Sequence, residues 1–207
     1  SVSYLGRPMT SWKRRDVARR VAFVPQFEPV AFPLTVRALV EMGRYPHVGV
    51  LGRPGPDDEQ AIETAMRLAG VLDFAERSVT NLSGGERQRA RIARGLAQER
   101  DVLVLDEPTA ALDLHFEMET FELLRTLVTD SELTVVLATH NLNLAARYAS
   151  DLMLLAGGRV RAAGPPDAVL CHDIIEDVYR WPVVVSPHPG PGRDTGAPQI
   201  IPLSRQV

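Results

Sequence analysis

Short apolar runs alternate with longer segments of helical periodicity in the second half of the chain. Runs rich in Val and Leu predict buried strands at Val102–Leu105, Thr134–Ala138 and Leu152–Leu155. A further strand is predicted at Arg159–Ala163, and helices at Leu112–Thr129 and Leu142–Tyr148. Strands separated by helices usually form a parallel sheet that is covered on both faces. The pattern therefore predicts an α/β fold with a mostly parallel sheet and flanking helices.

The first half of the chain has one comparable strand and then mainly helical patterns. The apolar run Val21–Val24 predicts a strand that Pro25 ends. After a loop, helices are predicted at Val36–Met42 with Thr35 as the cap, at Asp57–Ala69, and over a short stretch at Leu72–Glu76. The segment Gly43–His47 between them predicts a tight turn.

These patterns suggest how the chain is organised into parts. Residues from about 33 to 100 are expected to form a helical subdomain, and residues 1–32 and 101–180 an α/β core. Residues 181–207 are rich in proline and glycine, so they predict a loosely packed tail with one short strand at Ile200–Leu203.

Composition excludes several classes of function. The 207 residues carry a net charge of −3 with acids and bases interspersed, so nothing favours a nucleic acid as the main partner. The single cysteine, Cys171, cannot form an internal disulfide, and no Cys/His cluster has zinc spacing. The apolar runs are far shorter than the roughly 20 residues that a membrane-spanning helix needs. A cytoplasmic protein is the simplest interpretation, with any membrane role exerted through a partner.

The stretch from Asn81 to Arg89 has the features of a phosphate-binding element. Ser83 is placed to cap the helix that follows, and Gly84 and Gly85 allow backbone N–H groups to approach an anion at the positive end of that helix. An ordinary Ser-Gly-Gly loop is the alternative for this stretch alone.

Polar side chains follow three of the predicted strands. Asp106 and Glu107 come directly after Val102–Leu105, where the first acid can hold the hydration shell of Mg²⁺ and the second can orient and deprotonate a water. A helix-capping pair of acids is the alternative interpretation. Gln26 follows the first strand and His140 follows Thr134–Ala138, and ligands of parallel sheets bind at such carboxyl ends.

Five motifs in this order resemble those of the ATP-binding cassette (ABC) ATPases. They correspond to the Q-loop at Gln26, the LSGGE motif at residues 82–86, the Walker B strand at residues 102–107, the D-loop at residues 111–113 and the H-loop at His140. The resemblance implies a P-loop NTPase-like core with a helical subdomain, and ATP and Mg²⁺ as the ligands.

The resemblance also implies roles for single residues. Glu107 would be the general base, Asp106 the acid on the Mg²⁺ side, and His140 a contact to the γ-phosphate. Gln26 would sense Mg²⁺ and the attacking water and link them to a partner subunit.

The remaining motif residues are expected at a subunit interface. Ser83, Gly84 and Gly85 would contact ATP bound to a second protomer in a head-to-tail dimer, and Asp113 would lie along that interface.

A P-loop with the pattern G-x-x-x-x-G-K-[ST] is absent from these residues, since the single lysine, Lys13, lies in no such motif. With Ser1 as the first residue, the expectation is an N-terminally truncated ABC subunit that by itself binds ATP weakly or not at all, is inactive, and is poorly stable because a sheet edge and a core face lose their cover. A non-catalytic remnant with a regulatory or interaction role is the alternative, although Gln26, Glu107 and His140 are all retained.

Within the ABC ATPases, the closest resemblance is to importer subunits for iron-siderophores, haem and cobalamin. The segments that carry it are 36–47, 96–99, 112–114, 141–148 and 198–203, whereas Asn141 stands where an acid is usual. The resemblance implies a separate membrane permease, reached through a coupling helix near residues 26–53, and indirectly a substrate-binding protein. Arg44 and Tyr45 would be docking residues, on a protein held peripherally at the inner face of the plasma membrane.

Other prominent side chains are expected to be structural. By themselves, four aromatic side chains are expected to be core or packing residues, namely Phe23, Phe27, Tyr45 and Tyr148. The basic series Arg87, Arg89, Arg91 and Arg94 predicts a solvated helix face, with neutralisation of phosphate as the alternative.

Overall fold

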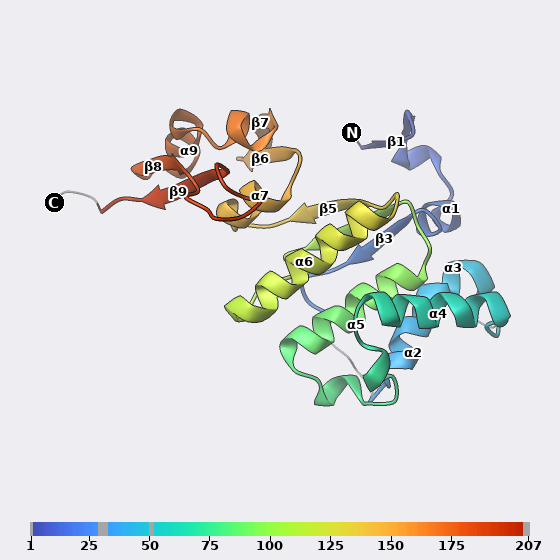
Figure 1. Cartoon of the computed structure of the whole chain (residues 1–207). Coiled ribbons are helices and arrows are strands. Elements are labelled where there is room, and N and C mark those ends of the chain that lie inside the picture. The colour runs from blue at the N-terminus through green and yellow to red at the C-terminus, as the bar shows by residue number, and fades with distance from the viewer. Residues whose placement is uncertain (1, 29–32, 50–51, 205–207) are drawn as a thin grey trace. The chain divides into compact units, whose positions relative to one another are not determined.

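The structure is a computed structural model that describes residues 2–28, 33–49 and 52–204 (Figure 1). The chain divides into two compact units, residues 1–138 and residues 139–207. Each unit has a hydrophobic core of its own.

The first unit contains a three-stranded parallel sheet. Its strands are β3 (Val21–Val24), β4 (Val102–Asp106) and β5 (Thr134–Ala138), in the order β3-β4-β5. In the register, Val24 lies beside Leu105 and Leu105 beside Leu137. The predicted strands at these positions are therefore confirmed, and so is their parallel arrangement.

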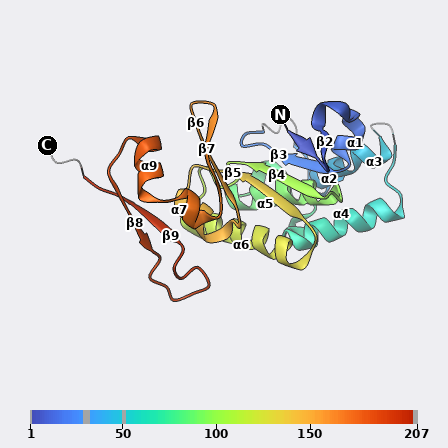
Figure 2. The ribbon, with the colours of Figure 1, turned by 90° about the horizontal axis from the view of Figure 1, so that it is seen from above.

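Helices cover one face of this sheet (Figures 1 and 2). Helix α5 (Gly84–Ala97) packs against β3, and α6 (Leu114–Asp130) packs against β5. The close approach of α5 depends on Gly95, because a Cβ there would lie 3.0 Å from a Leu103 methyl group and 3.4 Å from a methyl group of Val24. Leu124 and Leu127 of α6 complete the buried layer.

Several helices and 3₁₀ turns lie between β3 and α5 in the chain. They are α2 (Val36–Glu41), α3 (Tyr45–Val48), α4 (Pro56–Leu68) and the 3₁₀ turns η2 (Met42–Arg44), η3 (Leu72–Phe74) and η4 (Val79–Asn81). Of these, α2, α4 and η2 pack on α5, α3 packs on η2, and η3 packs on α4. Thr35 caps α2 as predicted, because its hydroxyl accepts from the Ala38 N–H at 3.1 Å. The predicted tight turn at Gly43–His47 is wrong, since these residues are helical and Gly43 packs directly on the Arg94 carbonyl.

Before the sheet, the chain forms a small basic module. The two-residue strands β1 (Ser3–Tyr4) and β2 (Arg7–Pro8) pair antiparallel, and a 3₁₀ turn, η1 (Met9–Ser11), leads to the short helix α1 (Arg14–Ala18).

The second unit consists of two antiparallel hairpins and three helices. The strands β6 (Leu152–Ala156) and β7 (Arg159–Gly164) form one hairpin, and β8 (Val183–Pro187) and β9 (Pro198–Pro202) the other. The helices are α7 (Leu142–Tyr148), α8 (Pro166–Val169) and α9 (His172–Tyr179).

The prediction of a loosely packed tail is wrong for the described part of residues 181–207. Val183 and Ile200 are buried in the second core. The Asn143 side chain of α7 accepts from the Ile200 N–H at 2.8 Å and donates to the Ile200 carbonyl at 3.2 Å. A side-chain amide thus fixes β9 on α7, which proline and glycine content did not indicate.

Candidate functional site

Gln26 and the Asp106-Glu107 pair follow neighbouring strands at the same edge of the sheet. Because β3 and β4 are parallel and Val24 lies beside Leu105, both strands end at this edge. The Asp106 and Glu107 side chains are half-buried and Gln26 is exposed. Glu107 has a positive φ of 45°, and its N–H donates to the Ala138 carbonyl at 2.9 Å. The chain is held in this left-handed turn at the point where the predicted base stands.

The loop from Glu107 to Asp113 is fixed by hydrogen bonds to α6. The buried Thr109 hydroxyl donates to the Glu117 carboxylate at 3.1 Å. Asp113 is exposed and caps α6, accepting from the Phe116 N–H at 3.1 Å. Thr109 and Glu117 were not indicated by the sequence, because no spacing rule links a loop hydroxyl to a carboxylate eight residues later.

Ser83 caps α5 as the sequence predicts. Its hydroxyl accepts from the Glu86 N–H at 3.2 Å, and the Glu86 carboxylate accepts from the Ser83 N–H at 2.8 Å. These hydrogen bonds, with the Ser83 backbone N–H as the largest cause, lower the pKa of Glu86. The start of α5 is thereby a rigid, reciprocal capping box.

The two glycines at the start of α5 have different surroundings. Gly84 is exposed, and an added Cβ there would lie 3.2 Å from a Leu112 methyl group. Gly85 is buried, and an added Cβ would lie well inside 3 Å of the Phe116 ring. Gly85 thus permits close packing between α5 and α6, a contact across thirty residues that the sequence pattern did not reveal.

The arginines of α5 are anchored, so the prediction of a solvated face is wrong. Arg91 donates to the Glu28 carbonyl at 2.8 Å, and Arg94 pairs with the Glu28 carboxylate at 2.6 Å. Arg89 pairs with Glu119 of α6 at 3.3 Å. Burial lowers the pKa of Arg91. Since Glu28 lies two residues after Gln26, these bonds tie the loop that carries Gln26 to the helix that Ser83 caps.

His140 belongs to the second unit. It comes two residues after the carboxyl end of β5 and is exposed. The following residue, Asn141, caps α7 by accepting from the Leu144 N–H at 3.1 Å. The polar side chain at 141 therefore has a local structural role.

The two residues predicted to dock a permease differ in exposure. Arg44 is 4% exposed and binds Asp58 at 2.8 Å and Glu99 at 2.6 Å, so its prediction as a surface docking residue is wrong. Tyr45 is 44% exposed. Phe23 and Phe27 are 56% and 80% exposed, contrary to the packing role predicted for them. Residues 29–32 and 50–51 of the predicted docking segment lie outside the described residues.

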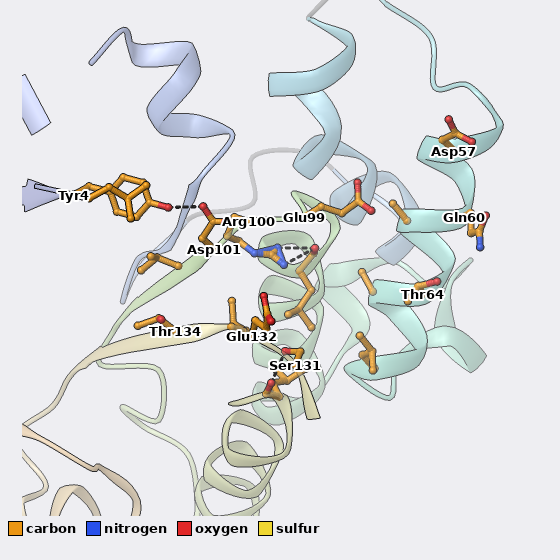
Figure 3. A pocket seen from close by; sticks show the side chains of 18 residues that line it. Tyr4, Asp57, Gln60, Thr64, Glu99, Arg100, Asp101, Ser131, Glu132 and Thr134 are labelled. Atoms are coloured by element: carbon orange, nitrogen blue, oxygen red, sulfur yellow. Dashed lines mark hydrogen bonds between the residues drawn. The ribbon is translucent and has the colours of Figure 1, made fainter. Parts of the chain in front are cut away.

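A pocket of about 970 Å³ opens where β4 and β5 begin (Figure 3). Asp106 and Glu107 lie at the other end of β4. Tyr4 donates a hydrogen bond to Asp101, and this contact is the main cause that raises the pKa of Tyr4 and lowers that of Asp101. Arg100 donates to the Leu96 carbonyl at 2.5 Å, and burial lowers its pKa to about 10. Its guanidinium thus satisfies a backbone carbonyl in the last turn of α5. None of the predicted site residues lines this pocket.

The sequence and the fold of this chain are similar to those of known proteins. A family model described as ABC transporter matches residues 1–110. The cobalamin import ATP-binding protein BtuD of Halobacterium salinarum is 46% identical over 90% of this chain, which spans 45% of that protein's length. The hemin import ATP-binding protein HmuV of Streptomyces coelicolor is 42% identical over 95% of this chain and 68% of its own length.

The fold comparison agrees with the sequence comparisons. A solved inward-facing structure, assigned to a metal-chelate type ABC transporter, shares 30% identity and a TM-score of 0.82 over 89% of this chain and 73% of that one. The predicted fold class, an ABC ATPase core with flanking helices, is confirmed. Within the part of the chain that is described, no helix is long and apolar enough to cross a membrane. Because the family model covers more than half of the chain, the chain belongs to the ABC transporter family.

Proposed function

We propose that this chain is part of the ATP-hydrolysing subunit of an ABC importer that takes up iron-siderophores, haem or cobalamin. The observation that carries the proposal is the placement of Gln26 and of the Asp106-Glu107 pair after adjacent parallel strands. The anchoring of Glu28 to α5 adds support, because it links this edge to the helix that begins at the LSGGE motif.

The donor set at the sheet edge fits a hydrated Mg²⁺ ion with ATP. Mg²⁺ is usually bound through one or two carboxylates, several waters and the phosphates of its nucleotide. The half-buried Asp106 supplies a carboxylate, and Gln26 supplies an amide oxygen from the neighbouring strand end. When bound, Mg²⁺ would neutralise phosphate charge as the transferring phosphoryl group departs.

Glu107 is the residue that we assign as general base. It would orient a water and accept its proton, and the left-handed turn at Glu107 with its bond to Ala138 fixes the backbone from which the carboxylate projects. His140 would contact the γ-phosphate, and Gln26 would report the occupancy of the site to a partner subunit.

We further propose that Ser83, Gly84 and Gly85 serve the ATP site of a second protomer. The exposed Gly84 at the amino end of the fourteen-residue helix α5 offers backbone N–H groups and the positive end of the helix dipole. Asp113 would lie at the same protomer interface. Because Gly85 packs on Phe116 and Asp113 caps the helix that carries Phe116, the two interface elements would move together.

A membrane permease is the second proposed partner, and it would dock on the exposed Tyr45 and Phe27. The cargo class is taken from the names of the relatives, which are cobalamin and hemin import proteins. A substrate-binding protein would be an indirect partner, and the subunit would act on the cytoplasmic side of the membrane.

The proposal is tested by replacing Glu107 with Gln in the intact protein assembled with its permease. ATP hydrolysis is expected to fall by more than about 100-fold, because proton transfer from water is lost while nucleotide binding persists. The matched control is Glu132→Gln, which changes an exposed carboxylate at the opposite edge of the sheet. Unchanged turnover in Glu107→Gln removes Glu107 as the base. Permease binding by a wild-type protein without ATP hydrolysis would instead favour the non-catalytic alternative.

A further inference from the structure

A dense cluster of cations surrounds α1. Six of the fourteen residues from 7 to 20 are Arg or Lys and one is acidic, in a chain whose net charge is −3. The cations are Arg7, Lys13, Arg14, Arg15, Arg19 and Arg20, and we call them the α1 basic cluster. Since this segment contributes +5, the rest of the chain carries a net charge of −8.

The fold gathers these cations into one small module. Trp12 lies at its centre, with the Arg7 guanidinium 4.7 Å and the Arg20 guanidinium 5.8 Å from the ring centroid. Tyr4 packs edge-on against the same ring at 5.6 Å. The two ends of the basic segment are thus held together rather than spread along the surface.

Most of this charge has no carboxylate partner in the described part of the chain. Arg20 pairs with Asp101 at 3.0 Å, whereas no ion pair joins Lys13, Arg14, Arg15 or Arg19 to a described acid. All four of these side chains belong to exposed residues.

Two cations also fix the module next to α3. Arg15 donates to the carbonyls of Pro46 and His47 at 3.1 and 3.2 Å, and Arg19 donates to the Pro46 carbonyl at 3.0 Å. Since α3 begins at the exposed Tyr45, the basic cluster lies beside the surface assigned above to the permease.

We propose that the α1 basic cluster binds the anionic headgroups of the lipid bilayer beside the permease. The proposal rests on the proposed function, which brings α3 to a membrane protein. Clusters of four to eight Lys and Arg residues near a membrane surface bind acidic lipids, each contributing on the order of 1 kcal/mol. A long nucleic acid is less suitable, because the rest of the chain is net acidic and would repel a polyanion that extends beyond the module.

The test is co-sedimentation of the intact protein, without nucleotide or permease, with vesicles of defined composition. Binding is expected to vesicles containing about one third phosphatidylglycerol, to weaken with salt, and to be absent for phosphatidylcholine alone. The double substitution Lys13→Gln/Arg14→Gln should weaken binding roughly 30-fold, because it removes two charged side chains that make no hydrogen bond or ion pair with the described residues. The matched control is Arg159→Gln/Arg161→Gln, which removes two exposed arginines of β7 in the other unit.

Three results would each overturn the inference. They are equal binding to neutral vesicles, equal losses in the two double variants, and tighter binding to a short RNA than to acidic vesicles. Circular dichroism and a melting curve establish that both variants are folded. ATP hydrolysis by Lys13→Gln/Arg14→Gln in detergent should be unchanged, so the failure of lipid binding remains distinguishable from failure of the proposed ATPase function.

Discussion

The two faces of the parallel sheet differ sharply in how well the chain covers them. On the face that packs on α5 and α6, four strand side chains are at most 1% exposed, namely Ala22, Val24, Leu103 and Leu105. The register aligns Phe23, Val104 and Val136 as a row on the other face, which we call the open face. There Phe23 is 56% and Val136 50% exposed.

An apolar strand residue is therefore not necessarily a buried one. Both faces are apolar in sequence, as expected of parallel strands that are covered on each side. Among the described residues, the close helix contact is on the α5 face, where Gly95 lets α5 approach Leu103 and Val24. Most of the stability of the first unit should therefore come from packing on the α5 face. Substitutions on the two faces test this expectation through the free energy of unfolding.

The largest effect is expected from Leu103→Ala. Leu103 is fully buried at the centre of the sheet, so the substitution removes apolar contacts and leaves a cavity. The free energy of unfolding should fall by about 2–5 kcal/mol, measured by urea denaturation. A loss below about 1 kcal/mol would contradict the view that this face carries the core.

A smaller loss is expected from Gly95→Leu, which adds volume instead of removing it. The new side chain would enter the contact between α5 and both Leu103 and Val24. Overpacking of this kind costs about 1–3 kcal/mol, partly offset by the better helix propensity of leucine. The control Gly70→Ala lies at a positive φ with open space around it, so it reports backbone strain without a packing clash. Equal stability of Gly95→Leu and wild type would show that α5 does not fit the sheet closely.

The sequence predicted the strands and the start of α5 well because those features depend on local patterns. The bounds of β5 and α7, and the caps made by Thr35 and Ser83, follow from periodicity and from the first turn of each helix. Such features need no knowledge of what lies opposite in space. Gln26 and Glu107 could be placed at strand ends for the same reason.

What could not be predicted involves partners far apart in the chain. Arg44 was assigned to a docking surface through the family resemblance, and no local pattern indicated its burial or its pairing with Glu99, 55 residues away. The α5 arginines appeared solvated because Glu28 is 63 to 66 residues away. The exposure of Phe23 could not be predicted either, because alternation shows which residues share a face of the sheet but not whether another element covers that face.

The ion pair of Arg44 and Asp58 should contribute about 1 kcal/mol to the free energy of unfolding, and this contribution should depend on pH. The substitution Asp58→Asn tests it. Hydrogen bonds from the Gly55 N–H and then from Arg44 lower the pKa of Asp58. A lowered folded pKa means that the stabilisation is present above the unfolded pKa of about 3.9 and is lost as the pH falls through the folded pKa. The variant should therefore be less stable than wild type at pH 7, by about the net value of one ordinary hydrogen bond, because the asparagine side chain still offers an acceptor oxygen.

Urea titrations of both proteins at neutral pH and near pH 3 measure this dependence. The stability difference should shrink at the acidic end. The exposed pair of Arg67 and Glu63 on the same helix α4 provides a control, since Glu63→Gln should change stability by only a few tenths of a kcal/mol. A difference in Asp58→Asn that grew on acidification would contradict the assigned direction of the pKa.

The smallest effect is expected from Val136→Thr on the open face. Val136 is half exposed, so the new hydroxyl can reach water, and β propensity is similar for the two residues. The free energy of unfolding should change by less than about 0.5 kcal/mol.

The same isosteric change at Val24 buries a hydroxyl between β3 and α5 and should cost at least about 1 kcal/mol more. If the two variants lost equal stability, the open face would be covered in the protein in solution, and the contrast between the faces would disappear. If only Val24→Thr is destabilised, the apolar row of Phe23, Val104 and Val136 contributes little to stability without a cover.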